Sequence, residues 1–359
     1  MIIGCLREDM SNALQGVQRA ISGKSVMPAL SGVMLSAEDD RLRLHATDLE
    51  IYLRSSIPGK IESAGKTLVN GKLLSDIVRN IDSDMISMES SEGQLEIKGG
   101  GFKSSLRTLP VEDFPVMPED RETMVEKVPM DAFRESISQV VRAASRDDKR
   151  PVLQGVLLEI NDNVICLVST DSYRLAATEL NIEGALKTEE KVIIPARAMQ
   201  ELHRWSGRGE ELRISRTEGQ IRFDMGESLM LAREIEGKFP NWRQLIPEGQ
   251  KISIKADRDR LLSTIKRVSL IGTTVVMDVV PGQIVFSAES RDVGRAEERM
   301  EAEVSGGEMK IAFNSEFLTD GISACSGENI TLLLDDPEKP GVLTCEGNPY
   351  RYLIMPIKI

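Results

Sequence analysis

The sequence of 359 residues is poor in the residue types that build metal sites. It has four cysteines and two histidines, and the cysteines form no C-x-x-C pair. Structural zinc sites need cysteine and histidine at short, regular spacings. We therefore expect no metal and no cofactor, and we expect the cysteine inside the apolar run NVICLVST to be a small buried hydrophobic residue. The residues concerned are Cys5, Cys166, Cys325, Cys345, His45 and His203.

Long apolar runs are also missing. No stretch approaches the roughly 18 apolar residues that span a bilayer. The first residues, MIIGCLREDM, contain neither the basic segment nor the apolar segment of a signal peptide. These absences predict a cytoplasmic protein without a membrane partner.

Positive charge is scarce as well. The chain has 45 Lys and Arg against 57 Asp and Glu, a net charge of −12. Proteins that bind nucleic acid usually present a basic surface. The composition therefore excludes a chain coated with lysine, and any contact with nucleic acid has to rely on a local concentration of basic residues.

What the sequence does contain is one pattern written three times. Segments 3–22, 127–145 and 252–270 each read as a short strand, an acidic helix start and an amphipathic helix. Internal repeats of this kind indicate that one structural unit is duplicated along the chain. Three arginines fall in register in the three copies: Arg19, Arg142 and Arg267.

Each of these helices is followed by two apolar strands joined by a tight turn. The hairpins cover 28–57, 151–180 and, more weakly, 273–300, and their turns are rich in Asp, Asn and Gly. A second helix and further alternating strands close each copy. The pattern predicts two helices on antiparallel sheet in every copy, which is an α+β fold.

The copies also mark the expected domain boundaries. The first two end alike, on Phe114-Pro115 and Phe239-Pro240. A chain of this length is expected to form two or three domains. We predict three, at residues 1–124, 125–247 and 248–359.

A Thr-Asp pair recurs at the end of the second strand of the first two hairpins. Thr170 and Asp171 in LVSTDSYRLAATEL stand 123 residues after Thr47 and Asp48 in LHATDLEIYLRSSI. An enzyme seldom repeats its active site, whereas Thr and Asp side chains commonly bond to nearby backbone in turns. The repeat favours a structural turn in both copies, with a site only where Tyr-Arg follows.

Four motifs in the right order give the chain a resemblance to a known family. VSTDSYRLA, GKFPNWRQLIP, AFNSEF and the C-terminal IMPIKI resemble the bacterial β sliding clamps, the processivity factors of the replicative DNA polymerase. The resemblance covers the whole chain. It implies three clamp-type domains per chain and a head-to-tail homodimer that forms a closed six-domain ring around duplex DNA. Such a clamp has no catalytic activity and no sequence specificity.

The resemblance also accounts for the acidic composition, because in this family helices line the hole and strands form the outer wall. The six expected helices together carry a charge of +1, so that −13 lies on the rest of the chain. Basic residues on helices and loops are the candidates for the DNA-facing surface. They are Lys24, Lys72, Arg79, Arg142, Arg146, Lys149, Arg150, Arg197, Arg204, Lys266 and Arg267.

In the clamp family the segment matching TDSYRL forms the wall of a pocket for short peptide motifs rich in Gln, Leu and Phe. The partners implied are the polymerase, the clamp loader and repair proteins. Gln244 stands where a basic residue is common, Gly272–Thr274 has no aromatic residue, and Pro151 replaces an aromatic residue near the DNA. The residues carried over to the pocket are Leu153, Thr170, Ser172, Tyr173, Arg174, Leu175, Pro240, Gln244, Leu245, Asn314, Phe317, Val342, Leu353, Met355, Pro356 and Ile357.

Other interpretations of the same residues remain at this point. Asp171, Tyr173, Arg174 and His203 could form an acid-base group of an enzyme, although no phosphate loop or nucleophile motif accompanies them. The final YLIMPIKI could be a plain edge strand. A repeat scaffold that binds only protein is a third class, and retention on circular DNA separates it from a clamp.

Overall fold

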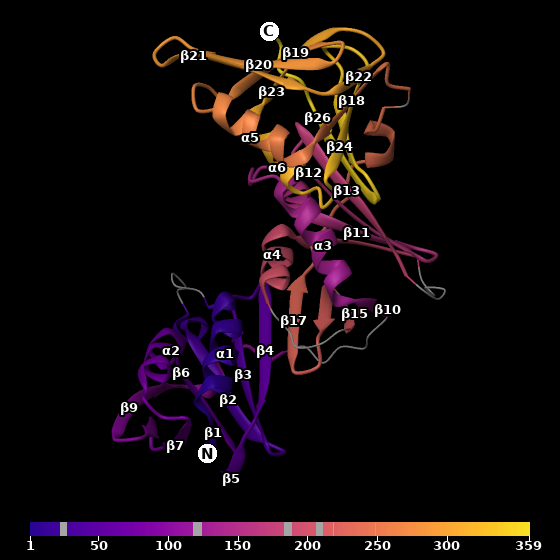
Figure 1. Ribbon diagram of the computed structural model, residues 1–359. Helices are drawn as coiled ribbons and strands as arrows, with labels where there is room; N and C mark the ends of the chain where they lie inside the picture. Colours follow the sequence, from indigo (N-terminus) through magenta and orange to yellow (C-terminus); the bar gives the residue numbers. More distant parts are fainter. Residues whose placement is uncertain (22–26, 118–123, 183–188, 206–210, 218, 248) are drawn as a thin grey trace. The chain divides into compact units, whose positions relative to one another are not determined.

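The computed structural model divides into two compact units (Figure 1). Unit 1 comprises Met1–Met130 and Arg204–Glu234, and unit 2 comprises Asp131–His203 and Ile235–Ile359. Both units consist of helices packed on antiparallel sheet. The structure describes all residues except 22–26, 118–123, 183–188, 206–210, 218 and 248.

Unit 1 is built on one sheet of 13 strands. Helices α1 (Arg7–Val17) and α2 (Gly71–Asn80) contact each other, and Figure 1 shows them side by side on this sheet. In spatial order the strands are β10 (Met124–Pro129), β15 (Glu211–Thr217), β16 (Gln220–Asp224), β17 (Ser228–Arg233), β4 (Ile51–Pro58), β3 (Arg41–Thr47), β2 (Gly32–Glu38), β6 (Gly65–Asn70), β9 (Phe102–Leu109), β8 (Gln94–Gly99), β7 (Met85–Ser91), β1 (Ile2–Leu6) and β5 (Lys60–Ser63).

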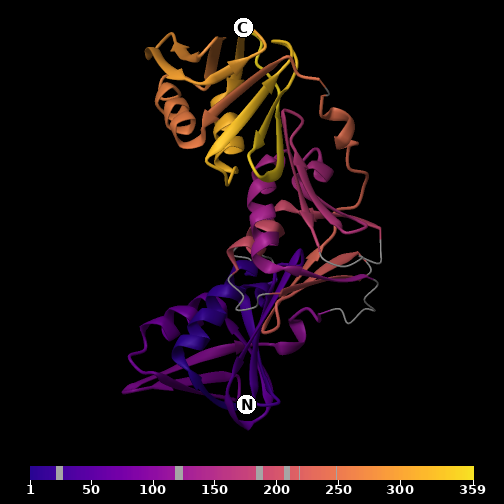
Figure 2. The ribbon, with the colours of Figure 1, turned by 45° about the vertical axis from the view of Figure 1, so that its right-hand side comes forward.

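Unit 2 contains a sheet of nine strands and a sheet of four. Its helices are α3 (Met130–Val140), α4 (Ala196–Arg204), α5 (Arg258–Val268) and α6 (Ser315–Ser323), and Figures 1 and 2 both show α5 beside α6. The larger sheet has the order β14 (Glu190–Pro195), β11 (Gly155–Asn161), β12 (Val164–Thr170), β13 (Arg174–Asn181), β26 (Asn348–Ile354), β25 (Gly341–Cys345), β24 (Asn329–Leu334), β18 (Ile252–Asp257) and β22 (Glu303–Ser305). The smaller has β21 (Gly294–Glu301), β20 (Gln283–Ser290), β19 (Thr274–Val280) and β23 (Met309–Asn314).

The helices form where the repeats predicted them, and their apolar stripes explain their packing. In α1 the residues Met10, Ala13, Leu14 and Val17 are buried. Their three- and four-residue spacing places them on one face of the helix, which packs against β4. Two helices for each repeat on antiparallel sheet confirm the predicted α+β fold. Within the described chain no helix has the length and apolar character needed to cross a membrane.

Strand pairing continues the sheets from one repeat into the next. Strand β17 of the second repeat pairs with β4 of the first, and β26 of the third pairs with β13 of the second. A compact unit therefore mixes strands of adjacent repeats. The domain boundaries at 124 and 247 stay a prediction, because the two compact units follow the paired strands rather than the repeats.

The tight turns of the hairpins have the geometry that their sequences predict. Asp39 and Asp40 both have left-handed backbone, with φ of 52° and 54°. Two consecutive residues in this region match the right-handed twist of the flanking strands. In the third repeat Gly282 takes the left-handed position, with φ of 81°, which glycine adopts without strain.

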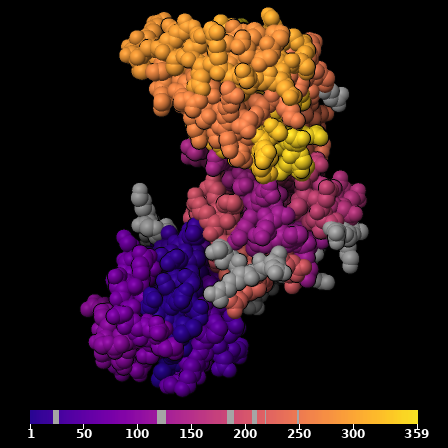
Figure 3. Space-filling view, viewed as in Figure 1, coloured from indigo at the N-terminus to yellow at the C-terminus, as the bar shows by residue number. Residues whose placement is uncertain are grey.

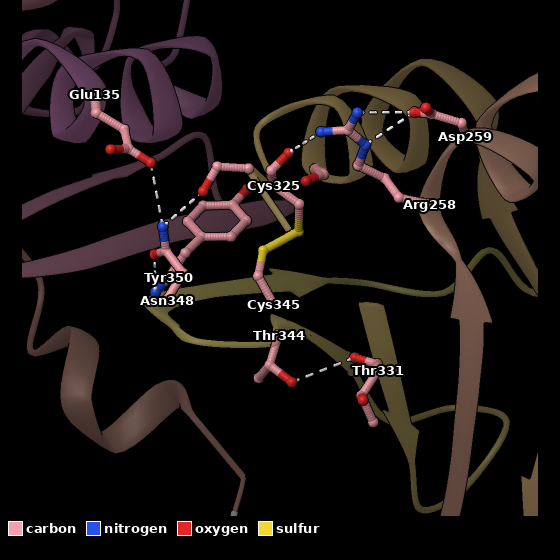
Figure 4. Close-up of a disulfide and its surroundings, with 11 residues drawn as sticks. Glu135, Arg258, Asp259, Cys325, Thr331, Thr344, Cys345, Asn348 and Tyr350 are labelled. Carbon is pink, nitrogen blue, oxygen red and sulfur yellow. Dashed lines mark hydrogen bonds and ion pairs between the residues drawn. A yellow bond between two sulfur atoms is a disulfide. The ribbon is translucent and has the colours of Figure 1, made fainter. Parts of the chain in front are cut away.

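The four cysteines fall into two groups. Cys5 and Cys166 are free and buried, and burial raises the pKa of their thiols to about 12 and about 11. The prediction that Cys166 is a small buried hydrophobic residue is confirmed. Cys325 and Cys345 form a disulfide that the sequence did not indicate, and it links the end of α6 to β25 (Figure 4).

This disulfide should stabilise unit 2. A cross-link between residues 20 positions apart restricts the unfolded chain, so we expect its reduction to lower the free energy of unfolding by about 3 kcal/mol. Urea unfolding with and without dithiothreitol, followed by circular dichroism, measures the difference. The Cys325→Ser, Cys345→Ser variant is the control, and its urea midpoint should be the same with and without dithiothreitol. If dithiothreitol did not change the wild-type midpoint either, the expected stabilisation by the disulfide would be contradicted.

Candidate functional site

The segment TDSYRL forms a tight turn between β12 and β13. The Thr170 hydroxyl donates to the Arg174 carbonyl at 2.7 Å and accepts from the Ser172 amide at 3.1 Å. Asp171 Oδ1 accepts from the amides of Tyr173 and Arg174, both at 2.9 Å. The Thr170 hydroxyl and Asp171 Oδ1 are thus bonded to the backbone of their own turn.

The first repeat makes the same turn with the same bonds. The Thr47 hydroxyl donates to the Ile51 carbonyl at 2.9 Å and accepts from the Leu49 amide at 3.0 Å. Asp48 Oδ1 accepts from the amides of Glu50 and Ile51. This correspondence confirms that the Thr-Asp pair is a structural turn common to both repeats.

The second repeat adds Arg174 where the first has Ile51. The Arg174 side chain is 7% exposed and all three guanidinium nitrogens are bonded. Nε donates to Asp171 at 3.0 Å, Nη1 to Asp320 at 2.6 Å and Nη2 to the Arg142 carbonyl at 2.7 Å. The turn is thereby fixed to α6, which carries Asp320.

Aromatic residues complete the surroundings of Arg174. Its guanidinium lies 4.3 Å from the ring centre of Phe317, and Nη1 is 3.5 Å from the Tyr352 hydroxyl. Burial alone would lower the pKa of Arg174, but Tyr352 and Asp320 together raise it above the usual value. Arg174 therefore stays charged and holds the turn in place. A donor this enclosed positions the neighbouring surface and does not itself reach out to a peptide.

Beside the turn lies an apolar floor on the larger sheet of unit 2. Strand pairing sets Leu175 opposite Leu353, and Leu353 opposite Val342, so that the three form a row across β13, β26 and β25. They belong to one buried cluster with Phe239 and Trp242. The sequence resemblance placed these three aliphatic residues in one pocket, and in the structure they are neighbours. All three are buried in the core of the sheet.

Two exposed side chains flank this floor. Tyr173 is 62% exposed and Met355 is 38% exposed, and the Met355 amide donates to the Tyr173 carbonyl at 2.8 Å. The C-terminal residues thus run beside the turn. Figure 3 shows part of the last, yellow segment of the chain on the surface of unit 2. The strand part of YLIMPIKI belongs to β26, which lies between β13 and β25 and is not an edge strand, and the residues after it form a partly exposed tail.

The remaining pocket candidates differ in exposure. Ser172 is exposed, has a φ of 79°, and accepts a bond from Arg150 Nη1 at 2.8 Å. Asn314 caps α6 by accepting from the amides of Glu316 and Phe317. Leu153 is buried, Pro240, Gln244 and Leu245 are exposed, and Pro356 and Ile357 are half-buried.

The basic candidates for a DNA-facing surface are exposed wherever the structure describes them. Lys72 and Arg79 lie on the face of α2 opposite its buried Leu74 and Val78. Lys266 is exposed on α5. Lys24 lies outside the described residues. Also exposed are Arg142, Arg146, Lys149, Arg150, Arg197, Arg204 and Arg267.

At least three of the described candidates are bonded to acidic residues. Arg267 is held by two oxygens of Glu298, and this contact lowers the pKa of Glu298 and raises that of Arg267. Arg142 pairs with Asp320 at 3.4 Å, and Arg150 with Asp147 at 3.2 Å. A phosphate would have to compete with these carboxylates, so Lys72, Arg79 and Lys266 are the stronger candidates.

The geometry does not assemble an active site. His203 Nδ1 lies 3.2 Å from the Arg134 carbonyl, while Asp171 and Arg174 are engaged in the turn. No cluster of three or more His, Cys, Asp or Glu side chains suited to a metal occurs in the part of the chain that the structure describes. The enzyme interpretation has no geometric support.

Sequence reasoning missed the partners that fix the turn. Asp320 and Tyr352 lie 146 and 178 residues after Arg174, and only the fold brings them together. A signal was present in the sequence, because Asp320 stands in α6 between the buried Leu318 and Ile322. A carboxylate that packs among buried residues needs a cationic partner.

The sequence and the fold both match known proteins along the whole chain. Residues 1–118, 127–241 and 243–358 match the N-terminal, central and C-terminal domain models of the DNA polymerase III beta subunit. The chain is 30% identical to the beta sliding clamp of Streptomyces coelicolor, with 98% of each chain covered, and 29% identical to that of Synechocystis, with 99% and 98% covered. A crystal structure of the DNA polymerase III subunit beta from Pseudomonas aeruginosa matches at 27% identity and a TM-score of 0.94 over the whole of both chains.

The two turns allow a matched test of the Arg174 bonds. Asp171→Ala and Asp48→Ala each remove the same two turn bonds, worth about 1–3 kcal/mol. Asp171→Ala also leaves a buried guanidinium with one carboxylate fewer, so we expect it to lower the free energy of unfolding further. Urea unfolding of both variants measures the difference. Asp171→Asn keeps Oδ1 and both turn bonds but loses the charge, so it should lose less stability than Asp171→Ala; equal losses in Asp171→Ala and Asp48→Ala would contradict the role given to Arg174.

Proposed function

The chain belongs to the DNA polymerase III beta subunit family, and from this premise we propose how its surfaces serve a sliding clamp. It is a non-catalytic clamp that confers processivity on DNA polymerase III. We further propose that it acts in the cytoplasm as a homodimer, with the polymerase, the clamp loader and repair proteins as partners.

The partner surface consists of the TDSYRL turn, the apolar row and the C-terminal tail. The observation that carries this assignment is the exposure of Tyr173 and Met355, joined by a backbone bond, beside the buried row of Leu175, Leu353 and Val342. Methionine adapts its shape to different apolar partners, which suits a surface shared by several proteins. One structure of the Pseudomonas aeruginosa clamp, 27% identical, is bound to griselimycin. A clamp of this fold therefore has a surface for a bound ligand.

A peptide bearing Gln, Leu and Phe would bury two large apolar side chains here. Each contributes about 1.5–3 kcal/mol, and a few hydrogen bonds add about 1 kcal/mol each. Ordering the peptide opposes part of this gain. The expected affinity is micromolar, about −8 kcal/mol, which allows partners to exchange.

Exposed residues give a cleaner test of this surface than buried ones. We expect Tyr173→Ser, Met355→Ser to weaken such a peptide about tenfold or more, because both substitutions remove apolar surface that the peptide would cover. Calorimetry with the dimeric protein measures the affinity. Met85→Ser, which removes another exposed methionine on β7, is the control and should bind normally. Leu175 is unsuitable because it is 1% exposed and its loss would disturb the sheet. Wild-type affinity in the double variant would place the pocket elsewhere.

The helices supply the DNA-facing surface of the proposed ring. Lys72 and Arg79 project from α2 away from its buried face, and Lys266 does the same on α5. Edge strand β21 and the exposed side chains of Leu270 and Val293 in unit 2 offer a surface for the second protomer. Contacts to phosphates alone make binding weak and dependent on salt. Retention then comes from encircling the DNA.

Charge reversal on α2 tests this arrangement. Lys72→Glu, Arg79→Glu should reduce the salt dependence of DNA binding by about 0.9 in log–log slope for each phosphate that the protein no longer neutralises. Lys60→Glu, Arg107→Glu makes the same charge change on exposed strand positions and should leave the slope unchanged. Both variants should sediment as dimers, and the loaded wild type should stay on nicked circles and leave linear DNA. Equal retention on both DNA forms, or equal slopes in both variants, would contradict the assignment.

A further inference from the structure

The sheet of unit 1 carries an arginine cluster that neither the partner surface nor the DNA-facing helices use. It consists of Arg41 and Arg43 on β3, Arg54 on β4 and Arg222 on β16. Strand pairing places them on one face of the sheet, since Arg43 is opposite Ser56 and the neighbouring pair on that face is His45 and Arg54. A hollow of about 460 Å³ lies over them, lined by Arg41, Arg43, Arg54, Ser56, Gly226 and Glu227.

Three of the four arginines bond to acidic residues around the hollow. Arg41 Nη2 bonds Glu227 at 2.7 Å, Arg43 Nη1 bonds Glu38, and Arg222 Nη2 bonds Asp224 at 3.0 Å. Within the described chain, Arg54 makes no hydrogen bond and no ion pair. The cluster therefore contains one guanidinium that the protein does not neutralise.

The unpaired charge of Arg54 is energetically unfavourable. Arg54 is half-buried, and its Nε is enclosed without a hydrogen-bond partner among the described residues. Arginine cannot lose its charge under ordinary conditions, and an unpaired charge at a desolvated site is strongly unfavourable. Burial lowers the pKa of Arg54; Asp224 opposes that change, and Arg222 and Arg43 add to it. Burial lowers the pKa of His45 to about 3, and the positive charges of Arg54, Lys66 and Arg43 add to this change.

The second repeat shows that the fold itself does not require these arginines. At an offset of 123 residues, Arg41, Arg43 and Arg54 correspond to Val164, Cys166 and Ala177. Those three residues pack in the apolar cluster under Phe239 and Trp242. In the first repeat Phe114 covers part of the same face, packing with Tyr52 and Leu229, and only the part that carries the arginines is charged and hollowed.

Ser56 provides a further donor at the hollow. Its side chain is 8% exposed, and its Oγ accepts from Arg41 Nε at 2.7 Å. The hydroxyl proton remains available to a ligand, since no acceptor for it occurs within the described chain. Arg43 on β3 and Ser56 and Arg54 on β4 therefore line the same hollow.

We propose that the arginine cluster binds an oxyanion of the phosphate type, held mainly by Arg54 and Ser56 and also by Arg43, which keeps its bond to Glu38. Three donor side chains can bind three oxygens of one phosphate group, whereas a carboxylate offers only two. The second negative charge of phosphate neutralises Arg54, while Arg41 stays paired with Glu227. The hollow is larger than one phosphate, so the anion is either free phosphate or the phosphate of a small monoester.

Calorimetric titration of the dimeric protein with inorganic phosphate, adenosine monophosphate and malonate, at constant ionic strength, tests the proposal. We expect saturable phosphate binding that Arg54→Gln weakens about tenfold or more, as loss of a charged hydrogen bond requires. Ser56→Ala should weaken it less. Binding of phosphate alone identifies free phosphate as the ligand, and binding of adenosine monophosphate as well identifies a phosphate monoester.

Arg107→Gln is the matched control, because it removes one exposed arginine from β9 of the same unit. It should bind phosphate like the wild type. Thermal unfolding without phosphate shows whether Arg54→Gln is folded, and we expect no loss of stability because the guanidinium has no partner to lose. Equal weakening in Arg107→Gln, absence of saturable binding, or equal affinity for malonate would each overturn the proposal.

Discussion

The buried guanidinium of Arg174 is the contact on which the partner surface depends. It joins the turn through Asp171, helix α6 through Asp320 and the last strand through the hydroxyl of Tyr352. These elements come from two different repeats and lie up to 178 residues apart. A planar group with donors on three nitrogens can satisfy several acceptors at fixed angles, which a lysine could not do. The surface beside it is therefore preorganised before any peptide arrives.

Duplication explains how such a surface arises without a new fold. The turn made by Thr47 and Asp48 is complete by itself, and the same bonds recur at Thr170 and Asp171. Replacing an aliphatic residue at the position of Ile51 by arginine adds long-range bonds to a turn that was already stable. The local hydrogen bonds preserve the backbone, and the added side chain connects it to its neighbours. A site can then differ between repeats while the strands that carry it stay alike.

The features that could be predicted from the sequence are those that depend on residues close together in the chain. Apolar spacing located the helices, Asp-Asp and Gly located the hairpin turns, and the repeated Thr-Asp pair identified a structural turn. The aliphatic row could be assembled because strand alternation places Leu175 and Leu353 on one face. The disulfide and the Asp320 contact could not be derived in this way, since both depend on how α6 packs against a distant strand. Pairing of strands between repeats also depends on contacts between distant parts of the chain. Because of this pairing, the compact units differ from the repeats.

Two arginines of this chain show what decides between structure and binding for a buried cation. Arg174 and Arg54 lie on corresponding strands, β13 and β4, and neither can release its proton. Arg174 meets two carboxylates, so its charge holds secondary-structure elements together. Arg54 stands among arginines whose acids are engaged elsewhere, so its charge is available to the proposed oxyanion. In a protein with a net charge of −12, acids are plentiful, and a guanidinium left without one reflects the local geometry rather than a shortage of partners. The position of each carboxylate relative to the strand pairing, and not the overall charge, therefore determines which arginines support the fold and which remain available to a ligand.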